Sequence, residues 1–500
     1  MEEKYIVKTK SGRIQGYFNR GVIKFKGIPY AAPPIGNLRF KPPVPVEPWD
    51  NIRDATKYSR VCPQPSSALE EMFSDPLPQS EEDSLTLNVW TQGLDDKKRT
   101  VMFFVHGGAF RTGSGRALDG SRLVLRGDVV VVSFNYRLGP FGFLYMPDVP
   151  NATPNVGLLD MVTALKWVRE NITQFGGDPE DITIFGESAG AFAVNCLLAM
   201  PAAKGLFKRA IVQSGYVNKF SCQPSAGIKT YETLIERLGI TKGDVESLRN
   251  IPFEKITEKL SNFEDMSQGV INFTPTIDKD TLPENPYEAV KNGFAEDIDL
   301  FIGSNLDESK MWTIWVSGGD NNFTEEKLLR RTTDLMRLID QNEAQSKELI
   351  NLYEKTRKTP GDIFDAINTD YQFRIPSIRL AEAQSKHQPN TFMYLFSWKT
   401  PWEGGKYGAM HALELSFVFG ILLAENKGIY AEKTEETQKL SEQMMDTWIS
   451  FARTGNPNHD NIPQLTPYDL KKRATIIFDK EVTIENDPYS DERIAWENIL

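Results

Sequence analysis

A serine between two glycines is the feature that most constrains what this chain can fold into. The pentapeptide Gly186-Glu-Ser-Ala-Gly190 follows a strand-like run at residues 182–185 and precedes a helix-compatible run at 191–200. A serine exposed on a sharp strand-to-helix turn sits in strained backbone, so small residues are needed on either side. The amides at the start of the following helix point to where an oxyanion would form. The pattern therefore predicts a serine hydrolase with Ser188 as its nucleophile.

Composition and charge narrow the class of protein. The 500 residues are 40% hydrophobic and 25% charged with a net charge of −11, so they indicate a soluble globular protein and give no support to nucleic-acid binding. The charged N-terminus predicts that there is no signal peptide, and the lack of a long apolar run predicts that there is no membrane span. Three cysteines and four dispersed histidines favour a cytoplasmic protein with no disulfide framework, no metal site and no cofactor.

Strand and helix patterns alternate between residues 100 and 215, which is typical of a mostly parallel sheet covered by helices. Short glycine-punctuated strands at residues 6–28 predict a small antiparallel portion at the N-terminus. No repeat, low-complexity tract or flexible linker interrupts the chain, so we expect one large α/β domain over residues 1–500. Two helical insertions, at about 225–290 and 323–388, are expected to cover the pocket. The proline-rich segment at 62–84 is interpreted as a surface loop, with a position over the pocket mouth as the alternative.

A second motif supplies candidate oxyanion donors. The apolar strand at residues 100–105 ends in His106-Gly107-Gly108, and amides without flanking side chains allow a carbonyl oxygen to approach closely. His106 is interpreted as a residue that orients this loop, rather than as the catalytic base.

A nucleophilic serine also needs a base and an acid that orients it. Of the histidines after Ser188, His387 and His459 lie in polar segments, whereas His411 follows a tryptophan-containing loop and precedes an apolar run, which makes it the candidate base. For the acid, Asp307 and Glu308 both follow the strand at 300–303. Neighbouring side chains of an extended segment point to opposite faces, so at most one meets His411, and the pattern alone leaves the choice open.

Many co-linear motifs resemble the type B carboxylesterases, the family of the cholinesterases and the bacterial para-nitrobenzyl esterases. They span essentially the whole chain: Phe25-Lys-Gly-Ile-Pro-Tyr-Ala, Leu38-Arg-Phe, Glu82-Asp-Ser-Leu-Thr-Leu-Asn-Val-Trp90, His106-Gly-Gly-Ala-Phe, Asn135-Tyr-Arg, Gly157-Leu-Leu-Asp160, Phe185-Gly-Glu-Ser-Ala-Gly, Gly303-Ser-Asn-Leu-Asp-Glu308, His411-Ala-Leu-Glu-Leu and Phe451-Ala-Arg-Thr-Gly-Asn-Pro. The resemblance implies an α/β-hydrolase fold. It also implies a catalytic triad of Ser188, Glu308 and His411. The oxyanion hole would be formed by the amides of Gly107, Gly108 and Ala189.

The resemblance implies further roles. Glu187 and Ser214 would form a polar pair behind the histidine, and Phe110 and Trp312 would either line the substrate pocket or belong to the core. Two structural ion pairs are also implied, Arg39 with Glu82 and Arg137 with Asp160. Ser84 stands where secreted members have a cysteine, so Cys62 lacks its usual disulfide partner.

We therefore expect a serine carboxylesterase that acts on small-molecule esters with short to medium acyl or aryl groups, as a monomer or weak homo-oligomer. One alternative is a catalytically inactive, cholinesterase-like binding or adhesion protein, which the filled triad positions disfavour. Another is a serine hydrolase that acts on amides, thioesters or lipids.

Overall fold

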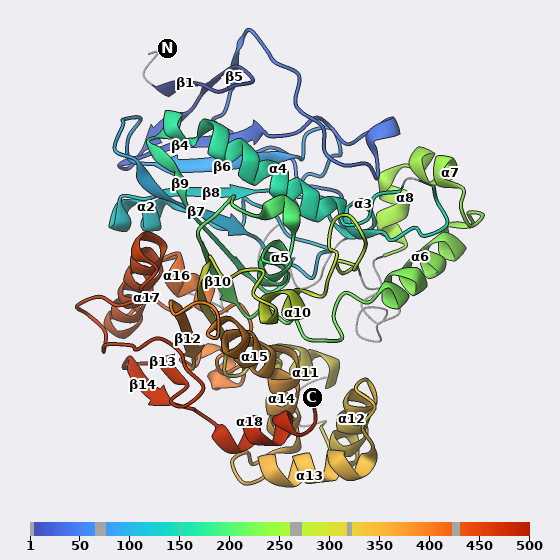
Figure 1. Cartoon of the computed structure of the whole chain (residues 1–500), viewed down its shortest axis with the longest axis vertical. Coiled ribbons are helices and arrows are strands. Elements are labelled where there is room, and N and C mark those ends of the chain that lie inside the picture. Colours follow the sequence, from blue (N-terminus) through green and yellow to red (C-terminus); the bar gives the residue numbers. More distant parts are fainter. Residues whose placement is uncertain (1–4, 66–76, 151, 261–272, 318–322, 423–430) are drawn as a thin grey trace. The chain divides into compact units, whose positions relative to one another are not determined.

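The computed structural model describes residues 5–65, 77–150, 152–260, 273–317, 323–422 and 431–500 (Figure 1). The chain divides into two compact units. The first consists of Met1–Ile211 and Val217–Ile298, and the second of Val212–Tyr216 and Asp299–Leu500.

The sheet of the first unit carries the predicted strands between residues 17 and 187. Its central strand β7 (Arg99–Val105) pairs in parallel with β8 (Val130–Phe134) on one side and with β9 (Gly177–Glu187) on the other. Every residue of β7 and β8 is buried, as expected for apolar runs covered on both faces. Antiparallel strands extend the sheet beyond β8 in the order β6 (Thr86–Thr91), β4 (Val22–Pro29) and β3 (Tyr17–Asn19).

A separate three-stranded sheet lies near the N-terminus. In it, β2 (Arg13–Gln15) pairs antiparallel with β1 (Ile6–Lys8) and parallel with β5 (Ile52–Asp54). The predicted antiparallel N-terminal portion is thus confirmed. The parallel partner β5 comes from beyond a proline-rich loop, where no local pattern indicated a strand.

Helices of the first unit follow the predicted pattern in part: the region 225–290 is helical at 224–238, 245–250, 253–258 and 286–291, whereas residues 273–285 form no helix. Residues 261–272 of that region lie outside the described residues. The helices and 3₁₀ turns are η2 (Gly36–Leu38), α2 (Ser121–Gly127), α3 (Gly139–Phe143), α4 (Val156–Asn171), η3 (Ile172–Phe175), α5 (Ala189–Leu197), η4 (Pro201–Ala203), α6 (Pro224–Leu238), α7 (Val245–Asn250), α8 (Phe253–Glu258) and α10 (Pro286–Lys291).

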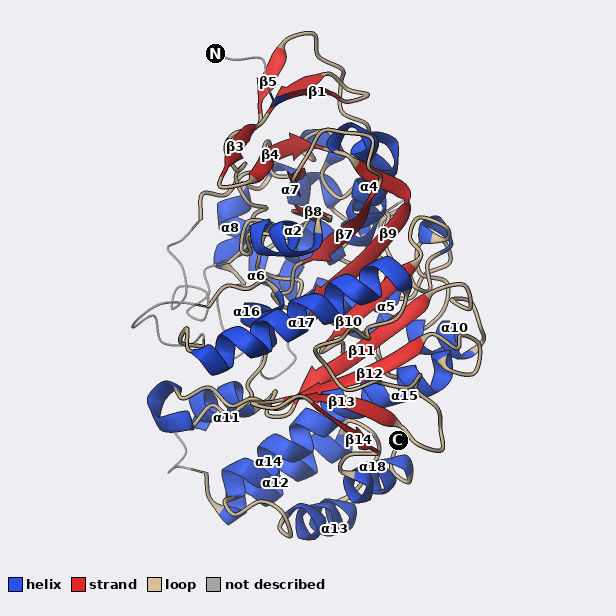
Figure 2. Ribbon diagram, turned by 90° about the vertical axis from the view of Figure 1, so that its left-hand side faces the viewer, coloured by secondary structure: helices blue, strands red, loops and turns tan. Residues whose placement is uncertain are grey.

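The second unit has its own run of parallel strands, which Figure 2 shows side by side. Strand β12 (Thr391–Phe396) is buried throughout and pairs in parallel with β11 (Asp299–Asn305) and β13 (Ala474–Phe478). The antiparallel β14 (Thr483–Asn486) follows β13. The boundary between the two units falls within β10 (Arg209–Gln213).

Helices dominate the rest of the second unit, including the whole predicted region 323–388. They are α11 (Lys310–Ser317), α12 (Glu325–Arg337), α13 (Glu343–Tyr353), α14 (Pro360–Thr369), the π-helical turn η6 (Asp370–Arg374), α15 (Ile375–Gln384), the 3₁₀ turn η7 (Trp402–Gly405), α16 (Glu414–Val418), α17 (Glu435–Thr454) and α18 (Ser490–Glu497).

The longest of these helices, α17, shows how the sequence sets an element. Thr434 accepts a hydrogen bond from the amide of Thr437 and completes a capping box, and Gly455 ends the helix with a φ of 75°. Between these signals, Trp448 packs its ring 5.1 Å from that of Phe301 and 5.3 Å from that of Tyr394. The predicted helix at 434–454 is confirmed, and it covers β11 and β12.

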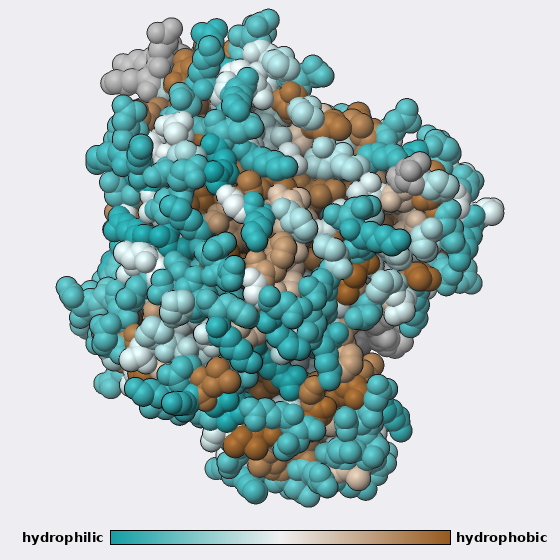
Figure 3. Space-filling model, in the orientation of Figure 1, coloured by the Kyte–Doolittle hydropathy of each residue, from teal (hydrophilic) through white to brown (hydrophobic). Residues whose placement is uncertain are grey.

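Hydrophilic residues dominate the face of the molecule shown in Figure 3, and hydrophobic residues gather there only in small groups. Within the described part of the chain, no helix is both long enough and apolar enough to cross a membrane.

Candidate active site

Ser188 occupies the predicted turn between a strand and a helix. Strand β9 ends at Glu187 and α5 begins at Ala189, and Ser188 between them has φ 56° and ψ −125°, a sparsely populated conformation for a residue with a side chain. A Cβ added to Gly190 would lie 2.1 Å from the carbonyl oxygen of Val105. Only glycine therefore fits there, which explains the second glycine of the motif.

The glycine loop after β7 lies directly beside this serine. A Cβ added to Gly107 would lie 3.2 Å from the Cβ of Ser188 and 2.9 Å from a carboxylate oxygen of Glu187. Gly108 has φ 108°, and a Cβ there would lie 2.2 Å from the carbonyl oxygen of Thr112. Both positions require glycine for steric reasons. The first unit thus holds the serine, the start of α5 and the His-Gly-Gly loop together.

His106 orients this loop through its backbone neighbours. Its Nδ1 lies 2.8 Å from the carbonyl oxygen of Gly107, and its ring stacks on Tyr136 with 4.3 Å between centroids. The Tyr136 hydroxyl donates to the carbonyl oxygen of His106 at 2.8 Å. Burial lowers the pKa of His106 to about 4, so the ring is neutral at pH 7. These contacts fit the orienting role inferred from the sequence.

His106 is expected to make the free energy of unfolding fall as the pH decreases from about 6.5 to about 4. Its folded pKa lies below the ordinary value of about 6.5, so the unfolded chain binds the proton first in this window. The contribution of neutral His106 to the free energy of unfolding is therefore fully present above pH 6.5. This contribution, at most about 3 kcal/mol, is lost as the pH falls to about 4. Urea unfolding at pH 7, 6, 5 and 4 measures the slope.

The matched variants for this titration are His106→Asn and His387→Gln. Asparagine keeps a donor near the position of Nδ1 and does not titrate, so His106→Asn should flatten the slope. His387 is exposed, and its replacement should leave the slope unchanged. An unaltered slope in His106→Asn would contradict the assignment.

The second unit holds the predicted base and acid in direct contact. His411 Nδ1 donates to Glu308 Oε2 at 2.6 Å, and the other carboxylate oxygen of Glu308 accepts the Asn305 amide at 2.7 Å. Both residues are buried, Glu308 completely. Asp307 instead accepts the Ala409 amide at 2.9 Å. The two neighbouring carboxylates therefore point to different partners, and the one bonded to the histidine is Glu308.

Two aromatic rings pack against the His411 ring. The centroid of Trp312, on α11, lies 4.8 Å from that of His411, and the centroid of Phe373 lies 5.1 Å from it. Trp312 and Phe373 also stack on each other, nearly parallel, at 6.1 Å. Trp312 thus contacts the histidine. Phe373 had no sequence signal, because it lies on the π-helical turn η6, which breaks the ordinary helical period.

Three further residues predicted for the site, Phe110, Glu187 and Ser214, each lie in a different environment. Phe110 is fully buried, with its ring 4.7 Å from Phe143 and 5.5 Å from Phe192, so its contacts favour the core role over the pocket role. Glu187 is buried next to Gly107 in the first unit. Ser214 belongs to the second unit, where its amide donates to the carbonyl oxygen of Gly303 at 2.8 Å.

One of the two predicted ion pairs is wrong, because the acidic partner of Arg39 is the residue before the predicted one. Arg39 Nε donates to Glu81 Oε1 at 2.7 Å, whereas Glu82 is exposed and donates its amide to the Ser80 hydroxyl at 3.0 Å. Glu81 and Glu82 lie at a bend, so only the first side chain faces inward.

The second ion pair, Arg137 with Asp160, is confirmed. Arg137 Nη2 lies 2.7 Å from Asp160 Oδ1, and Nε lies 2.8 Å from Oδ2. All three cysteines are described, buried and free. Burial raises the pKa of Cys62 to about 12, and the side chain next to its thiol is Ser84, so no disulfide forms there.

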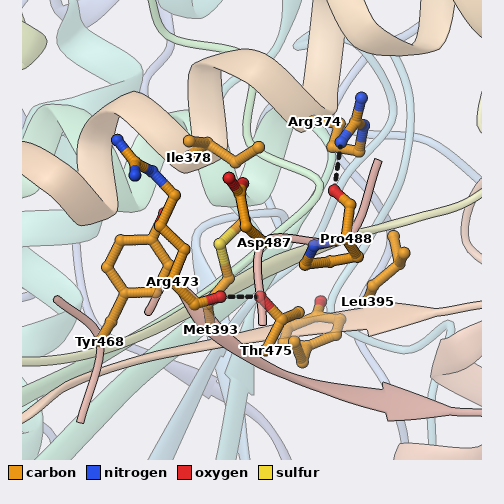
Figure 4. Close-up of a pocket in the computed structure, with 10 residues that line it drawn as sticks. Arg374, Ile378, Met393, Leu395, Tyr468, Arg473, Thr475, Asp487 and Pro488 are labelled. Atoms are coloured by element: carbon orange, nitrogen blue, oxygen red, sulfur yellow. Dashed lines mark hydrogen bonds between the residues drawn. The ribbon is translucent and has the colours of Figure 1, made fainter. Parts of the chain in front are cut away.

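A small cavity in the second unit is not a substrate site. It has a volume of about 10 Å³, lies between α15 and the strands β12 and β13, and is lined by residues that include Tyr468, Arg473 and Asp487 (Figure 4). This volume holds about one water molecule. Neither Glu308 nor His411 lines it.

A half-buried serine on a strand-to-helix turn, a glycine loop beside it and a glutamate–histidine pair after a parallel strand are the features of a serine hydrolase of the α/β class. The sequence profile described as the Carboxylesterase family matches residues 3–496. The para-nitrobenzyl esterase of Bacillus subtilis (strain 168) is 40% identical over 98% of this chain and 97% of its own length. The cholinesterase of Mus musculus is 34% identical over 91% of this chain and 80% of its own length.

Solved structures of esterases are also similar to this chain. A structure described as PNB esterase has a TM-score of 0.85 at 38% identity and covers 98% of this chain and 99% of its own. A carboxylesterase of Geobacillus stearothermophilus has a TM-score of 0.86 at 37% identity, and the match covers 99% of this chain and 100% of that one. The chain belongs to the carboxylesterase family. It has the α/β-hydrolase fold and is a serine carboxylesterase, as the sequence predicted.

Proposed function

We propose that Ser188, Glu308 and His411 form the catalytic triad of this esterase. The observation that carries the proposal is the 2.6 Å hydrogen bond from His411 Nδ1 to Glu308, which leaves Nε2 as the atom that can accept a proton from serine. The backbone N–H of Asn305 donates to the other oxygen of Glu308, so the carboxylate keeps its orientation as the imidazolium forms. Trp312 and Phe373 limit the movement of the ring.

The proposed reaction proceeds through an acyl-enzyme. His411 removes the proton of Ser188 as its oxygen attacks the ester carbonyl, and the amides of Gly107, Gly108 and Ala189 bind the resulting oxyanion. His411 then protonates the leaving alcohol. Water attacks the acyl-enzyme with the same assistance and releases the acid. Glu187 and Ser214 are proposed as polar neighbours of the histidine.

We propose esters with short to medium acyl or aryl groups as substrates. The relatives support this, since one is named a para-nitrobenzyl esterase and another, from Pseudarthrobacter oxydans and 31% identical, a phenmedipham hydrolase. Aromatic side chains next to the histidine suit an apolar or aryl group. The insertions at 225–290 and 323–388 would cover the pocket of a single catalytic domain. We place the enzyme in the cytoplasm, as a monomer or weak homo-oligomer.

A series of para-nitrophenyl esters from acetate to palmitate tests this function. We expect a burst of about one para-nitrophenolate per chain, because acylation of the serine precedes hydrolysis. The ratio kcat/KM should be highest for short and medium acyl chains and fall beyond decanoate. A steady rise past decanoate would contradict the proposed substrate class, and activity on none of the esters would contradict the function.

A further inference from the structure

The loop that carries Gly107 and Gly108 folds back on itself at Gly113. The amides of Arg111 and Thr112 both donate to the carbonyl oxygen of Gly108 at 2.9 Å. Gly113 has φ 106°, and a Cβ there would lie 2.5 Å from the carbonyl oxygen of Gly107. Gly113 is therefore in close contact with the peptide of Gly107, and a displacement of one displaces the other.

One side chain from a distant part of the sequence holds Gly113 on both sides. The amide oxygen of Gln64 accepts the Gly113 N–H at 2.9 Å, and its amide nitrogen donates to the Gly113 carbonyl oxygen at 3.1 Å. The same nitrogen donates to the carbonyl oxygen of Cys62 at 3.0 Å. Gln64 is only 7% exposed, so these bonds are made in an interior where a lost partner is costly.

The backbone of Gln64 is itself fixed. Its N–H donates to the side chain of Gln79 at 2.9 Å. Val61 donates to the carbonyl oxygen of Pro78 and accepts from the amide of Ser80, both at 2.9 Å, in a short parallel bridge. The side chain that holds Gly113 thus projects from an anchored segment, and it can transmit a defined position to the loop.

We propose that Gln64 is a positioning residue of the oxyanion hole. By holding Gly113, it keeps the peptide of Gly107 in register with Ser188, whose Cβ lies 3.2 Å from the Cβ position of Gly107. Oxyanion donors act only when they sit about 2.7–3.1 Å from the developing charge, so a small shift of this peptide weakens transition-state binding. This inference rests on the proposed oxyanion hole and adds the residue that sets its geometry.

The test replaces Gln64 with methionine, which removes the amide without adding charge, and with glutamate. With para-nitrophenyl butyrate, we expect kcat to fall about 10- to 100-fold in both variants, and KM to change less than about threefold. The affinity for an alkyl trifluoromethyl ketone, which forms a tetrahedral oxyanion on the serine, should fall by the same factor as kcat. The affinity for butyrate, which forms none, should stay the same.

Asn285 offers a matched control. It is also 7% exposed, donates to the carbonyl oxygens of Asn218 and Ser221 at 3.0 Å each, and accepts the Tyr287 N–H at 2.9 Å. Asn285→Leu and Asn285→Asp therefore remove a buried amide with the same number of backbone bonds. We expect them to lower the Tm as the Gln64 variants do, and to leave kcat and trifluoromethyl ketone affinity unchanged.

The Gln64→Glu variant provides a readout that does not depend on Gln64→Met being stable. A protonated carboxyl can accept the Gly113 N–H and donate to the Gly113 carbonyl oxygen, whereas a carboxylate can only accept. The ratio of its kcat to that of the wild type should therefore rise as the pH falls, and the same ratio for Asn285→Asp should stay constant. A rising ratio supports the proposal, and a flat one opposes it.

Three results would overturn the positioning role. They are wild-type kcat and ketone affinity in Gln64→Met, a loss of kcat in the Asn285 variants equal to that in the Gln64 variants, and a flat pH ratio in Gln64→Glu. If Gln64 variants are fully active while Ser188→Ala is inactive, the inference on Gln64 fails and the proposed serine mechanism stands.

Discussion

Replacing Ser188 with alanine is expected to lower kcat for an activated ester about 10⁵- to 10⁶-fold and to eliminate the para-nitrophenolate burst. The hydroxyl is the proposed nucleophile, and loss of the nucleophile alone costs about as much as loss of the whole triad. Alanine has the same Cβ as serine, so the strained φ of 56° imposes no new steric cost. We expect the Tm to change by less than about 2 °C, as for other substitutions that remove no packing or buried bond.

Two measurements separate loss of chemistry from loss of fold. A fluorophosphonate should label the wild-type protein at one residue, Ser188, and should not label Ser188→Ala. The control is Ser346→Ala on α13, where a buried serine donates to the carbonyl oxygen of Asn342 at 3.1 Å. This control should keep full activity and full labelling. Turnover in Ser188→Ala near the wild-type level would assign the nucleophile to another residue.

Local sequence patterns predicted the parts of the site that depend on local backbone. The turn at Ser188 and the loop at Gly107 need glycine because carbonyl oxygens lie within 2.9 Å of the missing Cβ atoms, and such needs are visible as motifs. The buried strands β7 and β8 were predictable for a similar reason, since each is a continuous apolar run. The parallel pairing of β2 with β5 was not, because it joins segments separated by a proline-rich loop.

Residues whose position depends on side-chain direction or distant contacts were predicted less well. Glu81 and Glu82 differ by one position at a bend, and only the backbone path shows which one meets Arg39. Phe373 reaches His411 from a π-helical turn, and periodicity of 3.6 residues cannot place it. Gln64 acts on Gly113 across 49 positions of sequence, so no motif includes both.

Glu308→Gln is expected to lower kcat about 10⁴-fold while the triad geometry is largely kept. The glutamine oxygen can still accept one bond, but it cannot stabilise the imidazolium, and it permits the wrong tautomer of His411. The loss should be smaller than for Ser188→Ala, because a neutral base and the oxyanion donors remain. Burial of Glu308 sharpens the effect, since water cannot replace the lost charge. Steady-state kinetics with para-nitrophenyl acetate and the rate of fluorophosphonate labelling measure it.

Asp307→Asn is the matched control, since it makes the same chemical change one residue earlier. The Asp307 carboxylate accepts the Ala409 amide at 2.9 Å, a bond that the oxygen of asparagine can also accept. We expect kcat within about threefold of the wild type and, at most, a modest fall in Tm. The reverse pattern, with Asp307→Asn inactive and Glu308→Gln active, would assign the acid to Asp307. Equal losses in both variants would mean that the histidine depends on the shape of the loop rather than on the charge bonded to it.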